Sequence, residues 1–221
     1  MLLKELALKY SKIEPHEVKN LISKLKIDSS YPVKRGSFGG VFRSTDMNTV
    51  YKIGRVAAGK DPSADAYLTY AKAVKHRNNP VFPQIYNIKV FELTHPEEAN
   101  QIGLEVTSHH AIVNYIYIVT LEKLLPFDPT DEEVEFLWNR YFIIPLPEKD
   151  SQERRSSQFV SYLREITNTN ALDIVKDPYA KELVQTLRGL LRKFSNDLYP
   201  SNIMMRRTPY GVQPVISDPV Y

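Results

Sequence analysis

Two different spacings of apolar residues divide the chain, and this division constrains the fold more than any other feature. Up to about residue 124, short β-prone runs prevail, and residues 111–121 are the clearest strand. After a break at residues 124–128, apolar positions recur at helical spacing, most clearly over 178–194. The sequence therefore predicts an α+β fold with a β-rich first half and a mostly helical second half.

The expected elements form three parts: an N-terminal helical extension (1–30), a β-rich lobe (31–124) and a mostly helical lobe (125–221). Thr130 and Glu133 have the spacing of a capping box and predict a helix start in the third part. In chain order we expect helices over 2–12 and 15–26, strands within 31–55, a helix over 63–77, strands over 84–93 and 111–121, helices from 130, over 156–166 and over 178–194, and a terminal hairpin.

Composition excludes several classes of protein. The chain of 221 residues has no cysteine, which rules out a disulfide framework, a thiolate metal site and a cysteine nucleophile. Its net charge of +3 is too balanced to indicate nucleic-acid binding. No apolar stretch is long enough for a membrane span or a signal peptide, so we expect a cytoplasmic protein without a membrane partner.

Three of the eight glycines, Gly36, Gly39 and Gly40, fall within five residues. Because glycine has no Cβ, main-chain N–H groups at a glycine-rich hairpin can approach phosphate oxygens closely. An ordinary tight hairpin is the alternative interpretation. The pattern is neither a dinucleotide-binding fingerprint nor a Walker loop.

Lys52 lies in the next β-prone run, where alternation places it on the same face as Val50 and opposite Tyr51 and Ile53. Its ammonium could then reach a phosphate beneath the glycine hairpin. The alternative is a lysine on an edge strand, where lysine discourages unwanted pairing.

Asp197 and Asn202 lie in a turn after the long helix, and Asp218 follows an apolar strand. An aspartate at such a turn can accept a proton from an attacking hydroxyl, and an asparagine can offer an amide oxygen to a hard cation. Asp218 is suitably placed at a strand end to bind Mg²⁺. Ordinary turn chemistry and a polar strand terminus are the alternatives.

The order of these features resembles the protein kinase superfamily over residues 31–221. The resemblance implies a bilobal fold with a truncated C-lobe, and an enzyme that uses ATP and Mg²⁺. It assigns Asp197 as the catalytic base, Lys52 to the α- and β-phosphates, and Asn202 and Asp218 to the metal. The implied nucleotide-binding residues are Gly36, Ser37, Phe38, Gly39, Gly40, Val41, Lys52, Leu121 as gatekeeper, Glu122, Lys123 and Leu124.

A narrower resemblance rests on residues 196–204 and 215–220, where Asn-Asp-Leu-Tyr-Pro-Ser-Asn-Ile-Met is followed by Val-Ile-Ser-Asp-Pro-Val. These segments are similar to those of the early serine/threonine kinases of short-tailed lytic bacteriophages. The resemblance implies a phage-encoded kinase in the host cytoplasm. Its substrates would be host bacterial proteins, with the transcription machinery as one candidate, and it would help to shut off host transcription.

Several residues depart from the kinase pattern. Ser195 replaces a bracing histidine, Tyr199 replaces a lysine, and Asp65 is the nearest acidic candidate to pair with Lys52. Only three residues follow Asp218 in this sequence, so we expect no activation segment. These departures keep two alternatives open: a pseudokinase that binds a host enzyme, with residues 1–27 as its docking element, and a small-molecule phosphotransferase of the aminoglycoside type. The acceptor, the preference for Ser/Thr or Tyr, and the oligomeric state stay undetermined.

Overall fold

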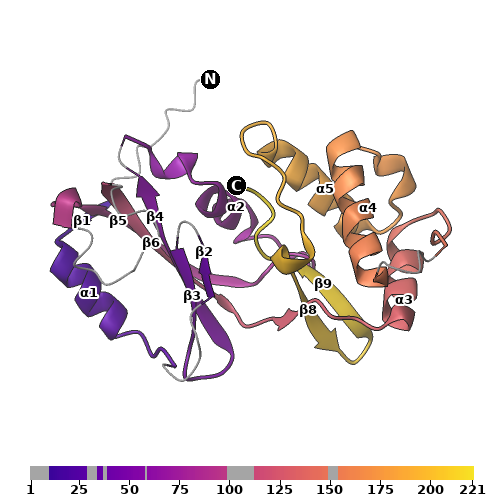
Figure 1. Ribbon diagram of the computed structural model, residues 1–221, viewed down its shortest axis with the longest axis horizontal. Helices are drawn as coiled ribbons and strands as arrows, with labels where there is room; N and C mark the ends of the chain where they lie inside the picture. The colour runs from indigo at the N-terminus through magenta and orange to yellow at the C-terminus, as the bar shows by residue number, and fades with distance from the viewer. Residues whose placement is uncertain (1–9, 29–33, 37–38, 58, 99–111, 149–153) are drawn as a thin grey trace. The chain divides into compact units, whose positions relative to one another are not determined.

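The structure, a computed structural model, describes residues 10–28, 34–36, 39–57, 59–98, 112–148 and 154–221. The chain forms two compact units, each described by itself below. Unit 1 comprises Met1–Asp65 and Tyr86–Lys123, and unit 2 comprises Ala66–Ile85 and Leu124–Tyr221. Unit 1 is built on a β-sheet and unit 2 is mostly helical, which confirms the α+β class (Figure 1).

The sheet of unit 1 has the order β1-β5-β6-β4-β3-β2 among the described residues (Figure 1). The strands β2, β3, β4 and β6 are antiparallel neighbours, whereas β1 runs parallel to β5. Both long strands expected at 84–93 and 111–121 are confirmed as β5 and β6, with residue 111 lying outside the described residues. The bounds are β1 Ser11–Ile13, β2 Lys34–Gly36, β3 Gly39–Arg43, β4 Thr49–Ala57, β5 Ile85–Leu93 and β6 Val113–Glu122.

Lys52 lies in β4, which pairs with β3 on one side and with β6 on the other. The interpretation of Lys52 as an edge-strand lysine is therefore wrong. An interior strand needs no lysine to discourage pairing, since both of its hydrogen-bonding edges are already occupied.

The described part of the N-terminal extension packs into unit 1. Helix α1 (Pro15–Ser23) buries Val18 completely, in a cluster that includes Ile53 of β4 and Ile116 of β6. The helix expected over 2–12 is wrong at residues 11 and 12, which belong to β1, and residues 2–9 lie outside the described residues. The extension is part of unit 1 for two reasons. Strand β1 forms main-chain hydrogen bonds with β5, and α1 packs on one face of the sheet.

Unit 2 contains the helices α2 (Ala66–Val74), α3 (Asp131–Tyr141), α4 (Arg155–Thr169) and α5 (Pro178–Leu190). Its sheet has the order β7-β8-β9, with β7 Leu125–Pro126, β8 Ile203–Thr208 and β9 Gly211–Ile216. The capping box of Thr130 and Glu133 is confirmed at the start of α3. None of the helices in the described part of the chain is both long and apolar enough to cross a bilayer.

Helix α2 belongs to unit 2, although the sequence-based division placed it in the β-rich lobe. The expected helix over 63–77 is a 3₁₀ turn, η1 (Pro62–Ala64), followed by α2. Tyr70 of α2 packs edge-on against Phe82, with ring centroids 6.5 Å apart, and its hydroxyl donates to the carbonyl of Ile216. These long-range contacts decide the placement of α2, and a local sequence pattern does not contain them.

Candidate functional site

The segment after α5 is a series of tight turns that ends in one turn of 3₁₀-helix, η4 (Pro200–Asn202). The Leu198 N–H donates to the side-chain oxygen of Asn196 at 3.0 Å, and the Tyr199 N–H donates to the carbonyl of Asp197 at 2.9 Å. Asparagine, aspartate and proline favour such turns because their side chains bond locally or preset the backbone. Leu198 is buried and anchors the segment, while its polar neighbours stay partly accessible.

Asn202 closes these turns onto Asp197. Its side-chain nitrogen donates to both the main-chain carbonyl and the carboxylate Oδ2 of Asp197, each at 2.8 Å. Because the amide nitrogen is committed to Asp197, the amide oxygen of Asn202 serves as the acceptor. The turn therefore orients one carboxylate and one amide oxygen together.

Asp218 joins the same turn through the main chain. The carbonyl of Asn202 accepts bonds from the Ser217 N–H at 3.0 Å, the Ser217 hydroxyl at 2.8 Å and the Asp218 N–H at 3.3 Å. In return, the Asp197 N–H donates to the carbonyl of Pro219 at 2.8 Å. The three residues predicted to form the catalytic and metal site of the second lobe thus belong to one hydrogen-bonded assembly.

Main-chain pairing also fixes the start of this loop. The Ser195 N–H donates to the Tyr221 carbonyl at 2.9 Å, and the Tyr221 N–H donates to the Ser195 carbonyl at 3.2 Å. Asn196 and Val220 form the next antiparallel bridge. Ser195 stands where the resemblance leads one to expect a bracing histidine. Here residues 219–221 hold the loop instead.

Tyr70 supports the strand end that carries Asp218. Its hydroxyl donates to the carbonyl of Ile216, two residues before Asp218. Burial raises the pKa of Tyr70 well above its ordinary value, and the nearby Tyr67 and the charge of Asp218 raise it further. Tyr70 is therefore a neutral donor at any pH near 7. Buried apolar side chains complete the base of the site: Leu198, Ile203, Val215, Ile216 and Val220.

Arg164 of α4 lies against the loop. Its guanidinium carbon is 4.5 Å from the centroid of the Tyr199 ring, a distance at which a cation is attracted to the ring face. The Tyr199 side chain is 45% exposed, so the contact leaves much of the ring accessible. Sequence reasoning noted Tyr199 and missed Arg164, since no local pattern connects the two residues.

The predicted nucleotide-binding residues lie mostly in unit 1. Val41 is directly opposite Lys52 in the β3–β4 register, and Leu121 is opposite Val50 in the β4–β6 register. Residues opposite each other, and alternate residues along one strand, share a face of the sheet. Val41, Lys52 and Leu121 therefore share the face opposite to that of Ile53, which packs against α1. This face offers apolar side chains beside a half-buried lysine.

The glycine cluster forms the expected hairpin. Gly36 of β2 pairs with Gly39 of β3, and Gly40 follows as a buried residue of β3. Ser37 and Phe38, also predicted to contact a nucleotide, lie outside the described residues. A phosphate-covering role for this hairpin stays a prediction.

The end of β6 contains the predicted contacts to a nucleotide base. Glu122 is the last residue of β6, and the Lys123 N–H donates to the carbonyl of Asn48 at 2.7 Å. Within the described chain, no residue accepts a hydrogen bond from the N–H of Leu124, where unit 2 resumes. The N–H of Lys123 is already bonded, so the N–H of Leu124 is the one that could donate to a nucleotide base.

Asn202 and Asp218 are the two residues predicted to hold a metal. No three histidine, aspartate or glutamate side chains gather into a metal site anywhere in the described ranges. Asn202 and Asp218, joined through a main-chain bond, carry one amide oxygen and one carboxylate. Mg²⁺ suits this small set of oxygen ligands, because it commonly keeps several waters and binds substrate phosphates alongside one or two carboxylates.

The predicted residues therefore form two groups, one in each unit. Asp197, Asn202 and Asp218 are brought together in unit 2, whereas Lys52 shares a sheet face with apolar residues in unit 1. Asp65, the candidate partner of Lys52, follows η1 in unit 1, and α2 itself contains no acidic residue.

Compared with models of known protein families and with curated proteins, the chain matches none. The functional assignment therefore rests on the residues and their geometry.

Proposed function

We propose that the chain is an ATP- and Mg²⁺-dependent phosphotransferase with a protein-kinase-like fold, acting as a serine/threonine protein kinase. The hydrogen bonds of Asn202 carry this proposal. They orient the carboxylate of Asp197 and tie the main chain of Asn202 to Asp218.

Asp197 would act as the general base. Its carboxylate Oδ2 is held by Asn202 at 2.8 Å, so one oxygen is fixed while the group as a whole remains partly accessible. In the reaction, the acceptor hydroxyl loses its proton to Asp197 and its oxygen bonds to the γ-phosphorus. The bond to the β-phosphate oxygen breaks, and ADP leaves. A positioned base contributes roughly 10²–10⁴ in rate, and positioning and charge neutralisation supply most of the rest.

Asn202 and Asp218 would hold Mg²⁺, which when bound neutralises charge on the phosphates. The amide oxygen of Asn202 is set by the two bonds that its nitrogen donates to Asp197. The position of Asp218 is set by its N–H bond to Asn202 and by the support of Tyr70 beneath Ile216. These bonds support the proposal because they fix the Asn202 amide and the main chain of Asp218 without a cation.

The shared face of Val41, Lys52 and Leu121 would receive the nucleotide. The apolar side chains would contact the base, and Lys52 would pair with phosphate oxygens under the glycine hairpin. The N–H of Leu124 would donate to the base edge. A phage origin, host bacterial proteins as substrates and a role in shutting off host transcription are proposed on the resemblance alone.

The experiment is transfer of labelled γ-phosphate from ATP with Mg²⁺, offered to bacterial lysate and, separately, to aminoglycosides. We expect labelled proteins with the wild type and none with Asp197→Asn or Lys52→Met. The matched controls are Asp173→Asn and Lys60→Met, which change exposed residues outside both groups.

Each outcome separates the candidates. Labelled serine or threonine in host proteins supports the kinase. Label only on small molecules identifies an aminoglycoside-type enzyme. Binding of Mg-ATP without any transfer indicates a non-catalytic module that binds a host protein, and wild-type transfer by Asp197→Asn refutes the role of Asp197.

A further inference from the structure

Helix α4 contacts the turn that carries Asp197 at two points. The side-chain nitrogen of Asn196 donates to Oδ1 of Asn168 at 2.7 Å, and the guanidinium carbon of Arg164 lies 4.5 Å from the centroid of the Tyr199 ring. Arg164 and Asn168 are four residues apart and therefore lie on one face of the helix. Because Asn196 and Tyr199 stand on either side of Asp197 in the sequence, this face of α4 is turned toward the segment that contains the candidate base.

The main chain of Tyr199 is bonded to both ends of this turn. Its N–H donates to the carbonyl of Asp197 at 2.9 Å, and its carbonyl accepts from the Asn202 N–H at 2.9 Å. The preceding Leu198 is buried, whereas Tyr199 has an extended backbone and is 45% exposed. Arg164 is therefore held against a residue whose main chain is fixed by Asp197 and Asn202.

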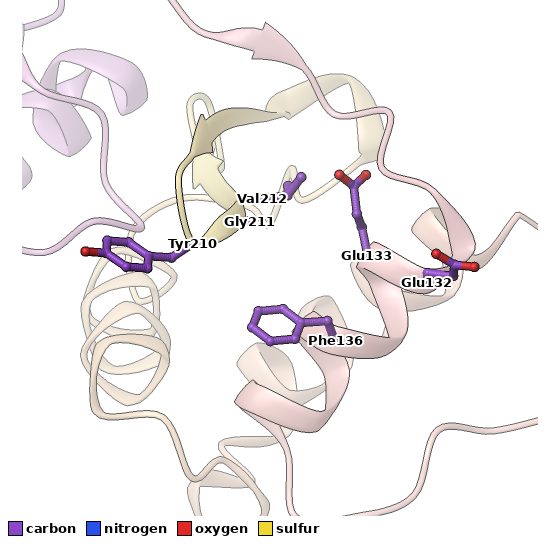
Figure 2. A pocket seen from close by; sticks show the side chains of 6 residues that line it. All are labelled: Glu132, Glu133, Phe136, Tyr210, Gly211 and Val212. Atoms are coloured by element: carbon purple, nitrogen blue, oxygen red, sulfur yellow. The ribbon is translucent and has the colours of Figure 1, made fainter.

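The charge of Arg164 has no counter-charge within the part of the chain that the structure describes. Its Nε is buried, and no described residue accepts a hydrogen bond from it or forms an ion pair with its guanidinium. A buried donor without an acceptor is rare in folded proteins. Two other arginines of unit 2 are paired, since Arg140 donates to Asp177 at 3.2 Å and Arg207 donates to Glu133 at 2.6 Å. Figure 2 shows Glu133 among the residues that line a hollow of about 220 Å³ between α3 and the β8–β9 hairpin.

We propose that Arg164 binds the γ-phosphate of the nucleotide and stabilises the negative charge on its oxygens during transfer. This inference rests on the proposed function, because it assigns a residue to the same reaction. The γ-phosphate is negative and must come close to Asp197, which is also negative, so a cation beside the turn offsets their repulsion. Arginine suits this role, because a guanidinium held over an aromatic ring still offers several N–H donors to phosphate oxygens.

The roles of the two contacting residues differ. Arg164 touches the phosphate, whereas Tyr199 is a positioning residue whose ring holds the guanidinium beside the turn. In the transfer, the acceptor oxygen bonds to the γ-phosphorus, its proton passes to Asp197, and ADP leaves. Arg164 neither gives nor takes a proton in this step, so its contribution is electrostatic.

The first test measures nucleotide binding, which needs no phosphate transfer. Calorimetric titrations with Mg²⁺ compare ADP with adenylyl imidodiphosphate, an ATP analogue that keeps the γ-phosphate and resists hydrolysis. We expect Arg164→Met to weaken binding of the analogue by about tenfold and to leave binding of ADP within about twofold. The matched control is Arg154→Met, which removes an 82% exposed arginine from the start of the same helix and should change neither affinity. Thermal melts establish that each variant is folded.

The second test separates kcat from KM with a host protein that the wild type phosphorylates. Arg164→Met should lower kcat by about 10²–10³, with little change in the KM for the acceptor. Arg164→Lys should recover part of this loss, because it restores the charge without the planar set of donors. Tyr199→Leu should lower kcat more than Tyr199→Phe, since only phenylalanine keeps a ring beneath the guanidinium.

The outcomes distinguish this inference from the proposed function. Wild-type transfer with an unchanged kcat in Arg164→Met overturns the role of Arg164 and leaves the kinase proposal standing. Equal loss of affinity for ADP and for the analogue also overturns it, because Arg164 then only supports the shape of the turn. A raised KM for the acceptor alone overturns it too, because the cation then binds the acceptor. Arg164-dependent preference for the analogue without any transfer supports γ-phosphate binding and refutes the phosphotransferase, and a wild type that binds neither nucleotide refutes both.

Discussion

The side-chain amide of Asn202 bridges two oxygens of one residue, donating to the carbonyl and to the carboxylate of Asp197 at 2.8 Å each. This relationship makes the geometry of the candidate base depend on a neighbour five positions away. Asp197 is also bound through its own N–H to Pro219. The loop between Asp197 and Asn202 is thereby held at both of these candidate residues.

Replacing Asn202 should therefore destabilise unit 2 as well as impair the proposed reaction. We expect Asn202→Ala to lower the free energy of unfolding by about 1–3 kcal/mol, because two partly buried acceptors lose their donor. Asn202→Asp should lower the free energy of unfolding further at pH 7, because the new carboxylate faces that of Asp197. The stability of this variant should increase as the pH falls toward 4 and the carboxylates are protonated. Urea unfolding measures both effects. Asn139→Ala, on the exposed side of α3, is the control, and equal stability of both alanine variants would contradict the prediction.

Gly54 makes room for a buried tyrosine in unit 1. A Cβ at this position would lie 2.1 Å from Cζ of Tyr117, whose side chain is 2% exposed. Because the ring has little space in which to move, Gly54→Ala should lower the free energy of unfolding by about 1–3 kcal/mol. In the background of Tyr117→Leu the same change should cost less, as a double-mutant cycle would show.

Gly189 provides the opposite case for comparison. It lies in α5 with no atom within 4 Å of a built Cβ. Gly189→Ala should therefore raise the free energy of unfolding by about 0.5–1 kcal/mol through helix propensity. An equal loss from Gly54→Ala in the wild-type and the Tyr117→Leu backgrounds would show that the Tyr117 ring is not the cause.

Glu133 should make stability depend on pH in the acidic range. The Thr130 N–H foremost, and then Arg207, lower the pKa of Glu133 below its ordinary value, partly opposed by burial. A carboxyl with a lowered pKa in the folded state stabilises the fold above its unfolded pKa of about 4.3 and loses this contribution as the pH falls below it. Glu133→Gln should therefore be less stable than wild type near pH 7, by roughly 0.2–1 kcal/mol, and the difference should vanish toward pH 3.

The adjacent Glu132 is a matched control for this effect. It is exposed and has no bonded partner in the part of the chain that the structure describes. Glu132→Gln should lower the free energy of unfolding less than Glu133→Gln near pH 7, because it loses only the interaction with the helix N-terminus. A pH-independent loss in Glu133→Gln would instead assign the effect to packing.

The sequence predicted best what local patterns determine. The run of β-branched and aromatic residues over 111–121 predicted β6, because such residues favour a largely buried strand. Thr130 and Glu133 predicted the start of α3 correctly, because the two hydrogen bonds of a capping box join residues only three positions apart. The spacing of Asp197 and Asn202 likewise placed two functional groups in one turn.

Features that depend on distant contacts were missed. The pairing of β1 with β5 joins Ser11 to Phe91, and residues 11 and 12 carry no alternation that would reveal it. Helix α2 belongs to unit 2 through Tyr70 and Ile216, and Arg164 meets Tyr199 only because α4 packs near the loop. In each case the deciding energy lies between segments far apart in sequence.

The place of α1 in the unit 1 core can be tested at Val18. This side chain is fully buried in a cluster that includes Ile53, Ile116 and Ile118. Val18→Ala should lower the free energy of unfolding by about 1–3 kcal/mol through lost burial and the cavity left behind. The exposed neighbour change Lys19→Ala should stay within about 0.5 kcal/mol of wild type. Hydrogen exchange should accelerate in β4 and β6 but not in α4 and α5, since the cluster lies in unit 1. Unchanged exchange in both strands would mean that α1 is an appendage and not part of the core.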